Sequence, residues 1–372
     1  MSAERAVARI DLGAIRHNVG VMSRAAGGAR LMAVVKAAGY GHGAVPAARA
    51  ALSGGASCLG VATVTEAEEL RGAGIDAPIL ILGPLTGGEW GRAAASGAEV
   101  TAWTPEGVRR AAAAGPSAPG VHLKLDTGMG RLGARPEDIA ALVEAAAATG
   151  EHIRVAGLMT HFATSDDTAG ENASFMSEQL VRFRSAVAAI RGRFPGAVVH
   201  AANSAATLRD PSAAFDMVRC GISIYGCSPF GGDPSEHGLR PAMSWTSYLA
   251  SVKTLRSRES VGYGRVWRAA RGTRVGLVPV GYADGYARCL SPAGAQVLAG
   301  GRRVPVIGTI SMDQLTVDLG PEGAETVGEE VVLIGARGPE RITAEDVAAW
   351  RGTINYEVTC AVGPRIPRVH EG

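Results

Sequence analysis

Residues 58–83 read CLGVATVTEAEELRGAGIDAPILILG, and this stretch decides the fold class. An apolar run, CLGVAT (58–63), is followed by a polar segment of helical period (64–74) and a second apolar run, PILILG (78–83). Strand, helix and strand in this order form the βαβ unit of a parallel sheet. Thr65 is expected to cap the helix, because Glu68 follows it at capping-box spacing.

The same alternation extends in both directions from this unit. Helices are expected at 64–74, 104–114, 136–149 and 172–192, and Asp11 is expected to be an N-cap. Strands are expected at 31–36, 58–63, 78–83, 98–103, 121–126, 154–162, 198–203 and 217–223. Eight strands alternating with helices predict an α/β protein with a (β/α)8 TIM barrel rather than an open doubly wound sheet.

The pattern of apolar and turn-forming residues changes near residue 239. Helical periodicity gives way to β-rich segments separated by Gly, Pro and Asp, at 244–255, 274–280, 295–299, 303–310, 315–319 and 330–335. The preceding GGDPSEHG (231–238) is typical of a linker. We therefore predict an N-terminal barrel over 1–238 and a C-terminal, mostly antiparallel β domain over 239–372.

Composition narrows the class of protein. A chain of 372 residues has room for about two domains. Its net charge of +2 is spread along the chain without a basic stripe, so no nucleic-acid partner is expected. The five cysteines are dispersed without a CxxC pair, which favours reduced thiols and no metal site. No apolar stretch has the length of a signal peptide or a membrane span, so we expect a cytoplasmic protein with no membrane partner.

Polar residues follow several of the expected strands. Lys36, His161, Asn203 and Arg219 lie at or near strand ends, at the rim where barrel enzymes build their active sites. Each alone could be a solvated charge or a satisfied polar group in the core. Their convergence on one rim favours an active site.

The sharpest local feature is AVVKAAGYGHG (33–43), in which a buried strand ends on Lys36. A lysine leaving an apolar strand is desolvated, which lowers its pKa and makes the neutral amine accessible. A neutral amine is what Schiff-base chemistry with an aldehyde cofactor requires. A lysine that merely caps a strand and reaches water explains the residues equally well, so both interpretations stay open at this point.

The stretch VVKAAGYGHG closely resembles the pyridoxal-phosphate attachment motif of alanine racemases. Further stretches resemble that family in the same order: IDLGAIRHN (10–18), LKLDTGMGRLG (123–133), THF (160–162), HAANSAAT (200–207), VRCGISIYG (218–226), SVGYGRVW (260–267), VGYADGYAR (280–288), SMDQ (311–314) and INYEVTCAVGPRIPR (354–368). The resemblance implies a fold-type-III barrel with a β domain, pyridoxal 5'-phosphate as cofactor, and a head-to-tail homodimer with shared active sites. It also implies the interconversion of L- and D-alanine, which supplies D-alanine for peptidoglycan.

The resemblance assigns the catalytic residues. Lys36 holds the cofactor and is one base, and Tyr263 of the partner subunit is the other. Two bases are needed because racemisation removes a proton from one face of Cα and returns it on the opposite face. Arg219 faces the pyridine nitrogen, to which it donates without protonating it, because arginine keeps its proton. His200 is expected to link Arg219 toward Tyr263, and His161 to lie close to the cofactor ring.

The remaining assignments also come from the resemblance. The phosphate is expected to contact Tyr40, Ser204, the backbone amides of Gly221 and Ile222, and Tyr356, with Asn203 opening a short helix beside it. Arg131 and the amide of Met312 are expected to hold the substrate carboxylate, and supporting roles fall to Lys124, His200, Tyr282, Arg288 and Asp313. Lys124 matches a position that is carbamylated in many relatives; the alternative is an unmodified lysine with an anion such as chloride between it and Arg131.

The sequence departs from the family pattern at two places. Ala38-Gly39 stands where Asn-Ala is usual, and Ser311 replaces a common cysteine. A serine or broad-specificity racemase of the same fold would share the catalytic residues and differ in pocket volume. A fold-type-III decarboxylase is disfavoured by Arg219 and Tyr263, and a non-catalytic pyridoxal-phosphate carrier is disfavoured by the β domain.

Overall fold

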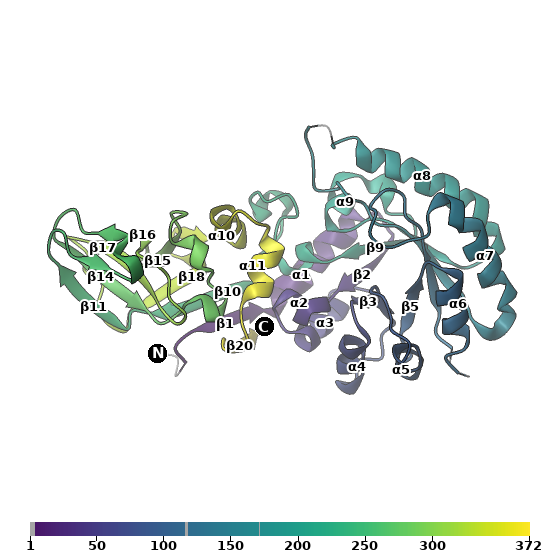
Figure 1. Cartoon of the computed structure of the whole chain (residues 1–372), viewed down its shortest axis with the longest axis horizontal. Coiled ribbons are helices and arrows are strands. Elements are labelled where there is room, and N and C mark those ends of the chain that lie inside the picture. The colour runs from purple at the N-terminus through teal and green to yellow at the C-terminus, as the bar shows by residue number, and fades with distance from the viewer. Residues whose placement is uncertain (1–3, 116–117, 171) are drawn as a thin grey trace.

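The computed structural model describes residues 4–115, 118–170 and 172–372. The chain forms a barrel and a β domain that lie side by side along the long axis of the molecule (Figure 1). Both ends of the chain lie on the β-domain side, where the first and last strands pair. None of the helices in the described ranges is long and apolar enough to cross a membrane.

Eight parallel strands form the barrel, in the hydrogen-bonded order β8-β7-β6-β5-β4-β3-β2-β9. They are β2 (Arg30–Val34), β3 (Cys58–Val61), β4 (Ile79–Ile81), β5 (Glu99–Ala102), β6 (Val121–Lys124), β7 (Val155–Met159), β8 (Val198–His200) and β9 (Met217–Cys220). Each lies within an expected strand or overlaps it, so the predicted barrel is confirmed. Asp216 closes the seam between β8 and β9, because its N–H donates to the carbonyl of Val199 (3.0 Å) and its carboxylate accepts from the Val199 N–H (2.8 Å).

Helices cover the outside of the barrel (Figure 1). They are α1 (Leu12–Ala25), α3 (Ala44–Ser53), α4 (Val64–Gly72), α5 (Glu89–Ala95), α6 (Pro105–Ala112), α7 (Ile139–Ala148), α8 (Phe175–Ile190) and α9 (Ser204–Arg209). Asp11 caps α1 as predicted, accepting from the Ala14 N–H at 2.9 Å. The prediction of Thr65 and Glu68 as a capping box was wrong: α4 begins at Val64, so the box is formed by Thr63 and Glu66.

The β domain is a mostly antiparallel sheet, as predicted. Its strands are β10 (Met243–Tyr248), β11 (Ser251–Leu255), β14 (Thr273–Val278), β15 (Gln296–Ala299), β16 (Arg302–Ile307), β17 (Leu315–Gly320), β18 (Glu330–Arg337), β19 (Glu340–Ile342) and β20 (Arg368–Glu371). The β-rich segment 244–255 divides into β10 and β11. The sheet also contains β1 (Val7–Asp11), which pairs with β10 and β20. The domain ranges 1–238 and 239–372 stay a prediction, but this sheet takes one strand from the N-terminus.

Two helices of the C-terminal part were not anticipated, α10 (Ala344–Arg351) and α11 (Asn355–Ala361). Helix α11 packs beside the segment Lys36–Tyr40 (α2), and Figure 1 shows it in yellow between the two domains. A Cβ added at Gly41 would lie 2.1 Å from the carbonyl oxygen of Thr359, so the two backbones touch at this glycine. The β domain is therefore joined to the barrel at the turn that follows Lys36.

Candidate functional site

The turn after Lys36 has a rare backbone conformation. Ala37, Ala38 and Tyr40 have φ of 53°, 51° and 53°, and Gly39 between them has 62°. Left-handed conformation costs about 1–2 kcal/mol for each residue with a Cβ, and only glycine adopts it freely. The surrounding structure must therefore hold the turn in place, which is common where a functional side chain is presented.

Glu66 is one group that holds this turn. Its carboxylate accepts the N–H of Ala37 at 2.7 Å and the N–H of Ala62 at 2.6 Å, and so ties the residue after Lys36 to the end of β3. Gly39 packs on the other side of the turn, where an added Cβ would lie 3.2 Å from the Cβ of Ala47. The glycine at this departure from the family pattern thus makes room for α3.

Four cationic side chains lie close enough to act on one another at this end of the barrel: Lys36, Lys124, Arg131 and Arg219. Burial, followed by the charge of Arg131, lowers the pKa of Lys36. Burial, followed by the charges of Arg219 and Arg131, lowers the pKa of Lys124 to about 8. The pKa of His161 is held well below its ordinary value by burial and then by the charges of Arg219, Lys124, Arg131 and Lys36. The chain has only three lysines, and two of them belong to this cluster.

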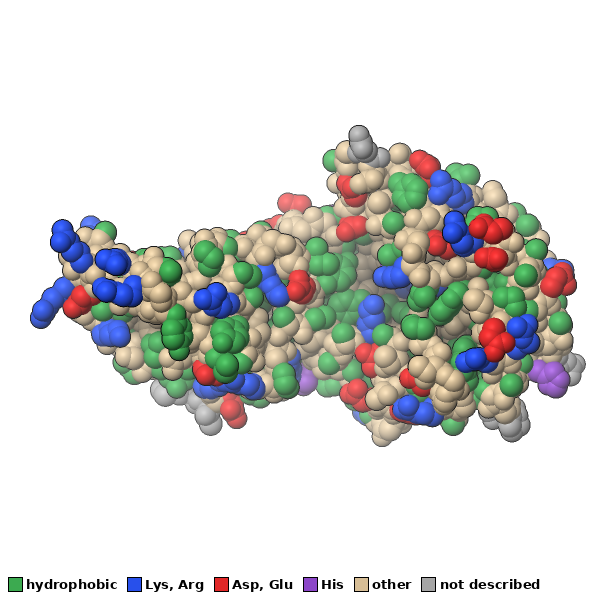
Figure 2. Space-filling view, viewed as in Figure 1, with side chains coloured by type: hydrophobic (Ala, Val, Ile, Leu, Met, Phe, Trp, Pro, Cys, Tyr) green, Lys and Arg blue, Asp and Glu red, His purple; other side chains and the backbone are tan. Residues whose placement is uncertain are grey.

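Among the described residues, the acids that act on this cluster already have hydrogen-bond donors of their own. The charge of Asp126 acts on Lys124, but its carboxylate already accepts the backbone N–H groups of Gly128, Met129 and Gly130. The charge of Glu66 acts on Lys36, and its carboxylate is likewise bonded to the turn. Figure 2 shows a hollow between the β domain and the barrel with Lys or Arg side chains on its wall. Uncompensated buried cations are unfavourable, so this arrangement favours the binding of an anion.

Arg219 is the most constrained of these cations. It is 4% exposed, and its two terminal nitrogens donate to the carbonyls of Thr160 (2.8 Å), His200 (3.1 Å) and Ala201 (2.9 Å). They also contact the Nδ1 atoms of His200 (3.0 Å) and His161 (3.1 Å). Within the described part of the chain, its Nε has no hydrogen-bond partner. Burial lowers the pKa of Arg219 to about 10, which leaves the guanidinium protonated at neutral pH.

The expected link from His200 toward Tyr263 is wrong. Nδ1 of His200 faces Arg219, and its Nε2 lies 2.8 Å from Nδ1 of His122, so neither ring nitrogen is left for a tyrosine. His161 differs, because only its Nδ1 contacts Arg219. Sequence reasoning missed His122, although strand alternation places it on the same face of β6 as Lys124.

A second group of residues surrounds the side chain of Tyr40, which belongs to α2; we call this group the cradle. Ser204 Oγ accepts the N–H of Gly221 at 3.0 Å, and a Cβ added at Gly221 would lie 2.3 Å from the hydroxyl oxygen of Tyr40. The rings of Tyr40 and Tyr356 are 6.1 Å apart. Neither tyrosine hydroxyl has a hydrogen-bond partner among the described residues, and burial raises the pKa of both phenols, so both remain donors.

The residues around this cradle behave as follows. Asn203 opens α9 as predicted, and its side chain accepts from the Ala206 N–H (3.0 Å) and bonds to Ser165. Ile222 is fully buried beside Gly221. The hydroxyl of the neighbouring Ser223 is buried without a partner, although its N–H approaches Ser204 Oγ at 3.4 Å. Hydroxyl donors that have no acceptor among the described residues, gathered around the backbone of Gly221, fit a phosphate group.

Tyr263 and its predicted companions lie on the β domain, and none of the contacts among the described residues brings them to Lys36. Tyr263 is 73% exposed, and its carbonyl accepts from the hydroxyl of Thr309 at 3.0 Å. Met312 is 52% and Tyr282 42% exposed, and the Tyr282 loop donates to the carbonyls of Ser311 (3.1 Å) and Met312 (3.0 Å). Arg288 is exposed on the same loop, and Asp313 is paired with Arg365 at 2.7 Å. Tyr356 behaves differently, because α11 carries it to the barrel of its own chain.

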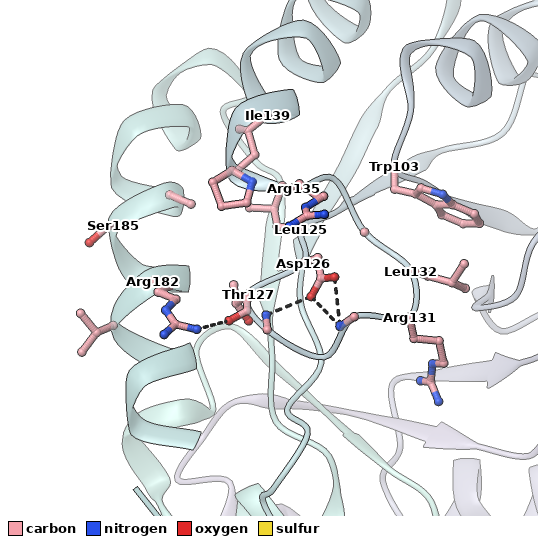
Figure 3. Close-up of a pocket in the computed structure, with 16 residues that line it drawn as sticks. Trp103, Leu125, Asp126, Thr127, Arg131, Leu132, Arg135, Ile139, Arg182 and Ser185 are labelled. Carbon is pink, nitrogen blue, oxygen red and sulfur yellow. Dashed lines mark hydrogen bonds between the residues drawn. The ribbon is translucent and has the colours of Figure 1, made fainter. Parts of the chain in front are cut away.

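A separate cleft of about 880 Å³ lies between α8 and the loop that carries Arg131. Figure 3 shows Arg131 and Arg182 on opposite sides of it, with Asp126 bonded to the loop backbone. Arg182 donates to the carbonyl of Thr127 at 3.0 Å. Arg131 lines this cleft but Lys36 does not, so the cleft is not the site of Lys36.

Comparison with known proteins agrees with this site. The family profile described as "Alanine racemase, N-terminal domain" matches residues 10–229, and "Alanine racemase, C-terminal domain" matches residues 242–370. The chain is 43% identical to the alanine racemase of Symbiobacterium thermophilum, over 98% of this chain and 97% of that protein.

Comparison with solved structures finds the same family. The alanine racemase from D-cycloserine-producing Streptomyces lavendulae has a TM-score of 0.94 at 41% identity, covering 100% of this chain and 98% of that one. The alanine racemase of Streptomyces coelicolor A3(2) has a TM-score of 0.92 at 43% identity, with 98% of both chains covered. With its barrel, its β domain and its strand-end lysine in the family's arrangement, the chain belongs to the alanine racemase family.

Proposed function

We propose that this chain interconverts L- and D-alanine, with pyridoxal 5'-phosphate held covalently by Lys36. The observation that carries the proposal is the lysine of lowered pKa in a cluster of cations whose neighbouring acids, within the described residues, already accept backbone N–H groups. At the same end of the barrel, the phenols of Tyr40 and Tyr356 and the Nε of Arg219 are donors that have no partner among the described residues. These groups match a phosphate and a ring nitrogen.

When bound, pyridoxal phosphate supplies an electron sink that acidifies the Cα proton of an attached amino acid. The protein's own groups orient it. Tyr40, Ser204 and Tyr356 would donate hydrogen bonds to the phosphate, together with the amide of Ile222 and that of Gly221, which bonds to Ser204 Oγ in this structure. Arg219 Nε donates to the ring nitrogen and keeps its proton, because a pKa of about 10 is well above neutral pH. Arg219 would therefore offer the ring nitrogen a hydrogen bond without transferring a proton to it.

Lys36 is the base on one face of the substrate. Its lowered pKa leaves more of the neutral amine available to take a proton at Nζ than an exposed lysine would have. Arg131 is close enough to depress that pKa, and we propose that it holds the substrate carboxylate together with the amide of Met312. Lys124 would hold Arg131 in position, either as a carbamate or through a bridging anion.

The second base has to come from another molecule. Tyr263, Tyr282 and Met312 are exposed side chains of the β domain, and no contact within the described part of the chain brings them to Lys36. We propose a homodimer in which Tyr263 of the partner subunit faces Lys36 across the substrate. His161, whose Nε2 is not used within the described chain, is the histidine that could bond to it.

The product points to a biological role. We propose that the enzyme works in the cytoplasm and supplies D-alanine for peptidoglycan. All five cysteines are free, which fits a reducing compartment.

The test is a chiral assay with alanine, serine and lysine side by side. Alanine should have the highest kcat/KM and serine a lower one, since an apolar pocket discriminates by only about 1–3 kcal/mol per group; lysine should be nearly inert. Borohydride reduction followed by peptide mapping should place the cofactor on Lys36, one of three lysines. The Lys36→Ala variant should lose both attachment and activity. Serine or lysine turnover at or above that of alanine would make the protein a broad-specificity racemase.

A further inference from the structure

A line of hydrogen bonds runs from Arg219 through the interior of the barrel, away from the cofactor cavity. Arg219 contacts His200 Nδ1 at 3.0 Å, and His200 Nε2 lies 2.8 Å from His122 Nδ1. His122 Nε2 in turn lies 2.9 Å from Oε2 of Glu99. Glu99 is the first residue of β5, so the line ends near the N-terminal end of the barrel strands. We call these four residues the relay.

The chemistry of the end groups fixes every proton in the relay. Arg219 can only donate, so Nδ1 of His200 must accept and its proton must be on Nε2. That proton is donated to Nδ1 of His122, whose own proton is then on Nε2 and is donated to the carboxylate of Glu99. A proton on both nitrogens of His122 would turn Nδ1 into a donor and break this order. Both histidines are therefore neutral, each as its Nε2–H tautomer.

Burial leaves the rings of His200 and His122 no alternative hydrogen-bond partners. His200 is 0% and His122 2% exposed, and each of their four ring nitrogens has one of the contacts above. Burial and then the charge of Arg219 hold the pKa of His200 well below its ordinary value. Burial alone would raise the pKa of Glu99, but hydrogen bonds from His122 and Arg154 outweigh it, so the carboxylate stays charged.

Two glycines leave the space that the relay occupies. A Cβ added at Gly157 would lie 2.3 Å from Nδ1 of His122. A Cβ added at Gly120 would lie 3.0 Å from Oε1 of Glu99. These side chains fill the barrel interior so closely that the rings of His122 and His200 meet edge to face, with centroids 5.0 Å apart.

Arg219 needs this support because its other acceptors carry no charge. They are three carbonyl groups and a ring nitrogen of His161, so within the described residues no carboxylate bonds to the guanidinium directly. Glu99 is the anion at the far end of the hydrogen-bonded line. Chains of hydrogen bonds polarise one another in a low-dielectric interior, so the carboxylate strengthens each bond toward Arg219.

We propose that His122 and Glu99 are positioning residues, which fix the tautomer of His200 and thereby hold Arg219 with its Nε facing the cofactor cavity. The position of Arg219 follows from the protein alone, whereas its effect on turnover rests on the proposed function. Removing the acceptor of His200 would leave its buried Nε2–H unsatisfied, which favours the other tautomer and so places a proton against the guanidinium. Arg219 would then rotate, and its Nε would no longer face the cofactor cavity.

The decisive variants are His122→Phe and His122→Gln. Phenylalanine keeps the ring and removes both nitrogens. Glutamine offers one acceptor and one donor, so it can accept from His200 and donate to Glu99. We expect kcat/KM for alanine to fall about 10–100-fold in His122→Phe, as is usual when an outer hydrogen-bond partner is removed, and to stay within a few-fold in His122→Gln. Equal losses in both variants, or a loss in neither, would overturn the proposal.

A second pair guards against a folding defect at position 122. Glu99→Leu removes the acceptor near the barrel end, and Glu99→Gln keeps one oxygen for His122. The first should lower kcat/KM at least several-fold more than the second, and equal values would overturn the proposal. Arg154→Gln is the matched control, since this 68% exposed side chain pairs with Glu99 on the oxygen that His122 does not use.

The tautomers can be read without any cofactor. In the apoprotein with ¹⁵N-labelled histidine, of which there are eight, the side-chain NMR signals of His122 and His200 should show the Nε2–H tautomer at neutral pH. In His122→Phe, the signal of His200 should change to Nδ1–H or lose its single-tautomer pattern. An Nδ1–H signal for His200 in the wild-type protein would refute the relay even if the protein racemises alanine. Correct tautomers in a protein that does not racemise alanine would refute the proposed function and leave the relay standing.

Discussion

Gly221→Ala tests the phosphate cradle by geometry alone. The φ of Gly221 is −108°, so no left-handed backbone demands glycine here. What demands it is space, because the new Cβ would lie 2.3 Å from the hydroxyl oxygen and 2.8 Å from Cζ of Tyr40. Ordinary contact needs roughly 1 Å more, and Tyr40 is 8% exposed and stacked on Tyr225 at 5.0 Å. The ring has little freedom to withdraw.

Overpacking of this kind typically destabilises a protein by about 1–3 kcal/mol. We expect the free energy of unfolding of the Gly221→Ala apoprotein, measured in urea, to fall by about 2 kcal/mol. Adding Tyr40→Phe removes the nearer atom and leaves Cζ, so the double variant should recover about half of that loss, a coupling of about 1 kcal/mol.

Cofactor binding separates this explanation from a general loss of structure. Tyr40→Phe removes a donor that we propose for the phosphate, so the double variant should regain stability without regaining affinity for pyridoxal phosphate. The reasoning is refuted if Gly221→Ala is as stable as the wild type. It is equally refuted if Tyr40→Phe makes the alanine variant less stable still.

Two further predictions concern Glu66 and Lys124. Glu66→Ala removes the acceptor of the Ala37 and Ala62 N–H groups, so the apoprotein should lose about 1–3 kcal/mol of unfolding free energy. Glu68→Ala removes only a surface ion pair with Arg92 and should change it little; equal effects would contradict the role of Glu66. Lys124 has a folded pKa of about 8 against an ordinary value of 10.5, so the unfolded chain binds more protons between these values and apoprotein stability should rise with pH from about 8 to 10.5. Lys124→Met should remove that rise, by about 3 kcal/mol at most, and an unchanged pH profile would show that the lysine is not desolvated.

The barrel could be predicted because its signals are local. Each strand is a short apolar run ended by a turn, and each alternates with a helical period, so the eight strands follow from neighbouring residues alone. The strand-end position of Lys36 and Arg219 follows in the same way. The assignment of Val7–Asp11 to the β domain could not be foreseen, because nothing in VARID indicates that it pairs with residues about 240 and 360 positions away.

The errors at the site also have physical causes. The link expected of His200 failed because the partner of its ring nitrogen comes from a strand that is not adjacent in the sheet. His122 reaches it from β6, past Gly157 of the intervening β7. The role of Glu66 was missed because its carboxylate bonds to backbone N–H groups of another segment, which leaves no trace in residue spacing. Tyr356 reaches its own barrel because α11 folds back onto α2, whereas Tyr263 stays exposed.

The central claim is that each active site joins Lys36 of one subunit to Tyr263 of the other. The most direct measurement mixes two inactive variants, Lys36→Ala and Tyr263→Phe, in equal amounts under conditions of subunit exchange, and follows alanine racemisation. Random exchange makes half of the dimers mixed, each with one intact site, so activity should return to about one quarter of the wild-type value. If the mixture stays as inactive as its components while mixed dimers form, the two residues do not share a site.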